Sequence, residues 1–150
     1  MANENFWKIT MKMKSKYGKI CLALLAILYI NLLPYLCRLP RGIDWAKQYL
    51  PDEGHLVGGL MFFHCFYSIP AVLLILSIYT SKKYAIPFIF TFLTVTIATI
   101  YFNYDYDLAS DAQAAIGLIF MPIIASFLGL IAFLLGHAIQ YLINKKEIVE

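Results

Sequence analysis

Hydrophobic residues in this chain gather in four long stretches that contain no charged side chain. The stretches cover residues 20–37, 56–81, 84–104 and 112–144. A helix needs about 20 apolar residues to cross the ~30 Å hydrocarbon core of a bilayer, where the backbone must satisfy its own hydrogen bonds. The stretches are continuous and lack the short alternating segments of a β-barrel. They predict an all-α integral membrane protein, an up-down bundle of four transmembrane helices.

Composition supports this interpretation. Of the 150 residues, 61% are hydrophobic and 14% are charged, whereas a soluble domain carries roughly 25% charged residues. Cys21, Cys37 and Cys65 form no C-x-x-C pair. Three scattered cysteines do not make a disulfide framework and give no sign of redox catalysis. The composition therefore excludes an ordinary soluble domain and a disulfide-stabilised one.

Lysine positions predict how the chain is oriented. Nine lysines lie on the N-terminal segment, the loop between the second and third stretches, and the C-terminal tail: Lys8, Lys12, Lys14, Lys16, Lys19, Lys82, Lys83, Lys145 and Lys146. The other two loops share only Arg38, Arg41 and Lys47. Because basic residues remain on the cytoplasmic side, we expect both termini in the cytoplasm and a multi-pass protein of the bacterial inner membrane.

The hydrophobic stretches also define the segments of the chain that lie outside the bundle. Residues 1–19 form a basic N-terminal segment, residues 20–144 the transmembrane domain, and residues 145–150 a cytoplasmic tail. Phe6, Ile9, Met13 and Tyr17 recur at helical spacing opposite several lysines, a pattern typical of an amphipathic helix on an anionic leaflet. The alternative is a basic topology determinant with no further role.

A stripe of small residues follows one face of the fourth stretch. Ala125, Gly129, Ala132 and Gly136 are spaced four, three and four residues apart. Small residues let two helix backbones approach closely, and packing is the main attraction between helices in lipid. The stripe therefore predicts a helix contact, either with a neighbouring helix of the same chain or with a partner.

Polar side chains inside the stretches are candidates for function, because intramembrane ionisable groups are costly. His64 shares a face with Ser68 on the second stretch, and His137 lies near the cytoplasmic end of the fourth. Thr91 and Thr94 follow one face of the third stretch. These threonines are either hydrogen-bonding contacts between helices or the lining of a pore shared between copies.

Five carboxylates on the outer loops form a possible acidic cap. They are Asp52, Glu53, Asp105, Asp107 and Asp111. Such a cap could gather a divalent cation or contact a basic partner. The spacing lacks the features of a calcium loop, and acidic residues in loops are commonly just solvated, so we predict no metal site.

The sequence contains no set of catalytic residues. It has no phosphate-binding glycine loop, no H-E-x-x-H and no G-x-S-x-G, and nothing resembles a nucleic-acid-binding module. We therefore predict a non-catalytic protein without cofactor that binds, within the lipid bilayer, to itself or to another membrane protein. By analogy of size and topology alone, sensor, regulatory and immunity or defence proteins of bacteria fit. The alternatives are a homo-oligomeric channel or transport subunit and, less favoured, a metal- or haem-dependent membrane enzyme subunit.

Overall fold

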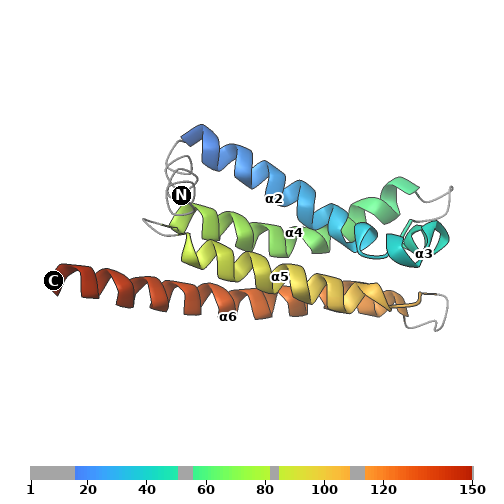
Figure 1. The fold of residues 1–150 in the computed structure, drawn as a ribbon. Helices are drawn as coiled ribbons and strands as arrows, with labels where there is room; N and C mark the ends of the chain where they lie inside the picture. The colour runs from blue at the N-terminus through green and yellow to red at the C-terminus, as the bar shows by residue number, and fades with distance from the viewer. Residues whose placement is uncertain (1–15, 51–55, 82–84, 109–113, 150) are drawn as a thin grey trace.

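The computed structural model describes residues 16–50, 56–81, 85–108 and 114–149, and every regular element in these ranges is a helix (Figure 1). The long helices are α2 (Lys16–Leu36), α4 (Leu56–Thr80), α5 (Ile86–Tyr104) and α6 (Ala114–Val149). Two short elements, η1 (Leu39–Arg41) and α3 (Ile43–Lys47), follow α2. The predicted all-helical fold is confirmed for this part of the chain. The proposed amphipathic helix falls on residues 1–15, outside the described residues.

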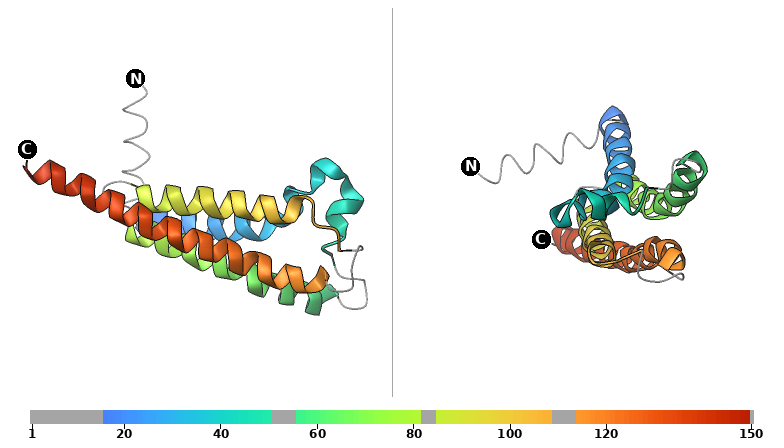
Figure 2. Two further views of the ribbon diagram at one scale, coloured as in Figure 1. Left: turned by 90° about the horizontal axis from the view of Figure 1, so that it is seen from below. Right: turned by 90° about the vertical axis from the view of Figure 1, so that its right-hand side faces the viewer.

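Successive long helices run in alternating directions, so that α3 and the start of α6 lie at one end of the bundle and the C-terminus lies at the other (Figure 1). We refer to these as the α3 end and the C-terminal end. Helix α6 continues past the start of α5 at the C-terminal end (Figure 2).

Within the described ranges, three segments are long and apolar enough to cross a membrane. They are Tyr17–Arg41, Ile86–Tyr104 and Ile116–Lys145, of 25, 19 and 30 residues. The apolar segment His64–Thr80 within α4 is shorter. The outward faces of the long helices are rich in large exposed apolar side chains, such as Leu24 and Phe127. An apolar surface of this kind matches lipid rather than water, which supports a helical membrane protein.

The small-residue stripe of α6 faces the inside of the same chain. A Cβ atom on Gly136 would lie 2.6 Å from the Cα atom of Pro87, and one on Gly129 would lie 2.5 Å from a methyl carbon of Val95. Ala125 and Ala132 are buried as well. The absence of larger side chains lets α6 approach α5 closely, and these two helices form the most extensive contact of the bundle. The stripe is therefore covered and is not a surface for an external partner.

Aromatic and aliphatic contacts attach α2 to the other helices. Ile30 and Leu33 of α2 pack with Ala71 of α4 and Val95 of α5 in one buried cluster. The hydroxyl of Tyr29 donates a hydrogen bond to Oγ1 of Thr96 at 3.2 Å. The core thus runs between all four long helices and leaves their outward faces free for lipid.

Candidate functional site

A hydrogen-bonded polar pair joins α2 to α4 within the apolar part of the bundle. Nδ1 of His64 lies 2.9 Å from Oδ1 of Asn31. The Asn31 amide nitrogen donates to the backbone oxygen of Ile27 at 2.9 Å, so the amide oxygen is the atom turned toward His64. An oxygen without a proton can only accept. His64 therefore donates from Nδ1.

This pair is only half-buried. Asn31 and His64 both retain partial exposure, and Ser68, one helical turn beyond His64, is exposed while its hydroxyl donates to the His64 backbone oxygen at 2.8 Å. The ring of Tyr35 lies 6.1 Å from the imidazole, centroid to centroid. We call Asn31, His64 and Ser68 the polar patch. Polar atoms that face hydrocarbon are costly and mark functional surfaces more often than packing positions.

A second polar centre closes the α3 end of the bundle around a fully buried arginine. Arg38, two residues after the end of α2, is 0% exposed. Its Nε donates to the backbone oxygen of Trp45 at 3.0 Å, and one terminal nitrogen donates to the backbone oxygens of Asn103 and Tyr106. The other terminal nitrogen donates to Oε1 of Gln48 at 2.7 Å. The guanidinium fork thereby joins the α3 segment to the end of α5.

No Asp or Glu side chain in the described part of the chain lies within ion-pair distance of Arg38. Its charge is instead stabilised by carbonyl dipoles at the C-terminus of α5, where the helix macrodipole is negative, and by aromatic faces. The guanidinium carbon lies 4.1 Å from the ring centroid of Tyr49 and 4.7 Å from that of Trp45. Cation–π contacts of a desolvated arginine are each worth about 1–2 kcal/mol. Arg38 therefore acts as a structural clamp.

Asn103 connects this clamp to α4. Its Oδ1 accepts hydrogen bonds from the hydroxyls of Tyr49 at 2.9 Å and Tyr67 at 2.8 Å, and its Nδ2 donates to the backbone oxygen of Thr99 at 2.7 Å. Burial raises the pKa of the Tyr49 phenol above its ordinary value. Both phenols therefore remain neutral donors, and the network is polar but well satisfied.

The predicted acidic cap is only partly described. Asp105 forms an ion pair with Arg41, and Asp107 accepts a hydrogen bond from Nε2 of Gln48 at 3.1 Å. Asp52, Glu53 and Asp111 lie outside the described residues. The two described carboxylates thus bind residues of the segment after α2.

The remaining polar candidates belong to packing contacts. Thr91 is 0% exposed and donates to the backbone oxygen of Pro87 at 2.7 Å, while Thr94 is half-buried. Nε2 of His137 lies 3.1 Å from Oγ1 of Thr80, and Phe133 packs edge-on against its ring. His64 lies near the start of α4, whereas His137 on α6 lies beside Thr80 at the end of α4. The structure therefore does not bring the two histidines together.

Among the described residues, no group of three or more His, Cys, Asp or Glu side chains could hold a metal ion. Comparison with protein-family models, curated proteins and solved structures finds no match. The polar patch and the Arg38 clamp therefore have to be interpreted from their own chemistry.

Sequence reasoning found His64 and Ser68 but missed three central residues. Asn31 was not distinguished from the apolar positions around it, although an amide in a charge-free stretch is itself a signal. The sequence pattern marks Arg38 only as a charge in a loop. Arg38 directly follows an apolar helix, and Trp45 and Tyr49 follow it closely in the sequence. This order is the sequence signal for an arginine buried against aromatic rings. Asn103 is likewise an amide in a charge-free stretch, 84–104, but its partners come from distant segments and could not be identified from the sequence.

Proposed function

We propose that α2, α4, α5 and α6 each cross the bilayer, with both termini in the cytoplasm of a bacterial cell and the α3 end outside. Helices α2 and α5 begin, and α4 and α6 end, at the C-terminal end of the bundle (Figure 1). In the sequence the lysine-rich segments adjoin these four helix termini, and basic residues favour the cytoplasmic side. Helix α4 has 25 residues, long enough for a crossing. The α3 end would then carry the ion-paired and hydrogen-bonded groups around Arg38 at the outer interface.

We further propose that the protein is a non-catalytic binding module, which recognises a second copy or another membrane protein through the polar patch. The observation that carries this proposal is the half-exposed hydrogen bond between Asn31 and His64. Asn31 precedes Arg38 by seven residues, so it lies roughly 10 Å deeper along α2. At that depth no bulk water hydrates the exposed side of the patch.

A partner helix would satisfy the patch better than lipid does. Hydrogen bonds between transmembrane helices are worth about 0.6 kcal/mol on average and up to ~1.7 kcal/mol. Lipid tails offer neither donors nor acceptors, whereas a polar side chain on a partner helix offers both. The apolar neighbours Ile69 and Val72 are exposed beside the patch and would supply packing area. Sensor, regulatory and immunity roles would each use such a contact.

The α5 threonines give no support to a shared channel. Of the two predicted pore-lining threonines, Thr91 is buried within one chain at 0% exposure and Thr94 is half-buried, so neither presents a fully exposed hydroxyl to a pore between copies. We therefore favour binding over conduction.

The proposal is tested by site-specific photo-crosslinking in cells that make the protein. A benzophenone amino acid replaces Ser68 in the patch or, as a matched control, Leu134, which is equally lipid-facing on α6. We expect a defined adduct from position 68 and none from position 134. The adduct should disappear when His64→Leu or Asn31→Leu is added.

Two outcomes would contradict the proposal. One is the absence of any protein adduct at position 68. The other is an adduct that persists unchanged in both leucine variants while the protein remains folded, as judged by its thermal melt in detergent.

A further inference from the structure

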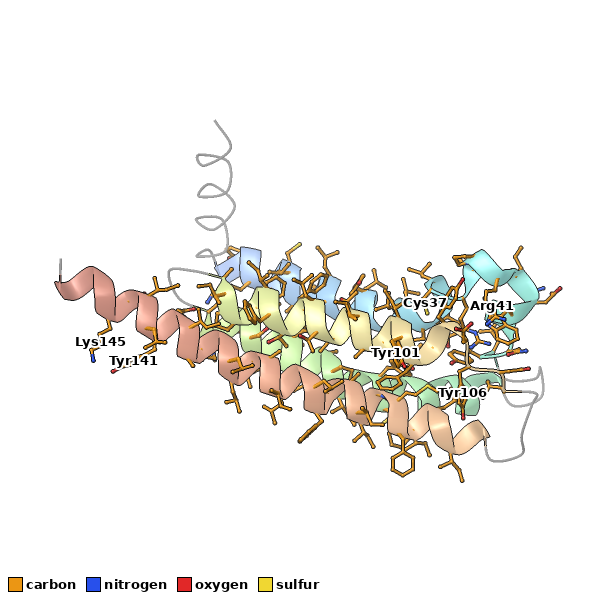
Figure 3. The ribbon with its side chains drawn as sticks, turned by 60° about the horizontal axis from the view of Figure 1, so that its bottom comes forward. Cys37, Arg41, Tyr101, Tyr106, Tyr141 and Lys145 are labelled. Carbon is orange, nitrogen blue, oxygen red and sulfur yellow. The ribbon has the colours of Figure 1, made fainter. Side chains whose placement is uncertain are left out.

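A pocket of about 760 Å³ opens on the outward side of α5 near the α3 end. Its deeper wall is apolar and contains Ile97, Ile100 and Met121, whereas its rim toward the α3 end contains Tyr104, Asp105 and Tyr106. Figure 3 shows Tyr106 and Arg41 at this end, with Tyr101 on α5 close by and Tyr141 and Lys145 at the other end. The pocket is separate from the polar patch, which lies on α2 and α4.

The pocket changes from apolar to polar along the helix axis. Ile97 and Asp105 are eight residues apart, which corresponds to roughly 12 Å along α5. The apolar part lies toward the middle of a segment that can cross a membrane, and the polar rim lies at its end. A ligand that fits both parts has an apolar tail parallel to α5 and a polar head beside Asp105.

Asp105 of the rim has an opposite charge beside it, Arg41, which does not itself line the pocket. The Asp105 side chain is 77% exposed and is paired with Arg41, whose side chain is 37% exposed. The Arg41 guanidinium stacks on the ring of Trp45 at 4.2 Å and lies 5.8 Å from that of Tyr104. Arginine suits phosphate, with several donors in a planar fork. A carboxylate that lines a pocket together with Tyr104 and Tyr106 suits an ammonium group.

We propose that this pocket binds one phospholipid whose zwitterionic headgroup carries a primary ammonium, that is, a phosphoethanolamine lipid. The ammonium pairs with Asp105 and the tyrosine rings, the phosphate pairs with Arg41, and one acyl chain occupies the wall of Ile97, Ile100 and Met121. An anionic lipid without an amine would pair with Arg41 alone and would meet the Asp105 carboxylate unfavourably. The site therefore discriminates between headgroups by charge.

Trp45 reports on this site directly, because its Nε1 donates to the backbone oxygen of Tyr104 at 3.1 Å. The chain has two tryptophans, so Trp7→Phe leaves Trp45 as the single tryptophan, which can be excited selectively over the tyrosines. The protein is placed in vesicles that mix phosphatidylethanolamine and phosphatidylglycerol. In one sample the phosphatidylethanolamine carries brominated acyl chains, and in a second sample the phosphatidylglycerol does. Quenching of Trp45 then measures which lipid is enriched next to it.

We expect phosphatidylethanolamine to be preferred about fivefold, equivalent to ~1 kcal/mol. Asp105→Asn should reverse the preference toward phosphatidylglycerol, because Arg41 then lacks its counter-ion. Asp44→Asn, which removes an exposed carboxylate outside the pocket, should leave the preference unchanged. Equal quenching by both lipids in the parent protein would overturn the proposal, as would an unchanged preference in Asp105→Asn.

Discussion

Replacement of Arg38 by alanine should destabilise the α3 end more than any other single change of a charged residue. Arg38 donates four hydrogen bonds, three to backbone oxygens and one to Gln48. Its removal leaves these buried acceptors without their donor and also deletes two cation–π contacts.

The magnitude follows from those contacts. An orphaned buried acceptor costs about 1–3 kcal/mol, but the four losses share one site and do not add fully. Removal of one member of a buried charged network typically costs about 3–5 kcal/mol. We expect a loss in this range for Arg38→Ala. For Arg38→Lys we expect ~2 kcal/mol, because lysine keeps the charge without the planar fork.

The assay is reversible unfolding by sodium dodecyl sulfate in mixed micelles, followed by the fluorescence of Trp45 in the Trp7→Phe background and by circular dichroism. Arg41→Ala is the matched control, because it removes a neighbouring arginine whose ion pair with Asp105 is exposed and worth at most ~1 kcal/mol. The reasoning is refuted if Arg38→Ala costs no more than Arg41→Ala.

Three further predictions use the same unfolding assay. Gly136→Ala should cost about 1–3 kcal/mol and more than Gly129→Ala, because the first new Cβ meets α5 backbone and the second meets side-chain methyl carbons of Val95 and Leu73; equal costs would contradict this. Asn103→Leu should cost about 2–4 kcal/mol, since two buried phenols lose their acceptor; a loss below ~1 kcal/mol would argue against the network. Because burial raises the pKa of Tyr49, the folded state keeps a proton that the unfolded state loses above pH ~10. The free energy of unfolding should therefore fall as the pH rises above ~10, and Tyr49→Phe should make this fall with pH shallower. The same dependence on pH in the parent protein and in Tyr49→Phe would contradict the prediction.

The helices were predictable because hydrophobic stretches and the backbone's need for hydrogen bonds leave few alternatives in lipid. The small-residue spacing of α6 predicted a close helix contact, but it could not identify the neighbour. Which helix packs against the stripe depends on contacts such as that of Gly136 with Pro87, two residues that are far apart in the sequence. In the folded chain the stripe lies against α5 and α4, so a contact within one chain is enough to account for the spacing.

The polar centres were less predictable than the helices. His64 was identifiable as an ionisable group in an apolar stretch, whereas its partner Asn31 depends on the register between α2 and α4. Arg38 is charged and directly follows an apolar stretch, a position that usually means exposure to water or headgroups. Only the tertiary fold shows that α3 and the end of α5 enclose it.

Labelling of single cysteines in intact cells tests the membrane arrangement on which the account rests. In a variant lacking Cys21, Cys37 and Cys65, one cysteine replaces Asp44 or Lys145 and meets a maleimide that does not cross membranes. Four crossings with cytoplasmic termini predict labelling at position 44 in intact cells, and at position 145 only after permeabilisation. Labelling of position 145 in intact cells, or protection of position 44, would contradict the account.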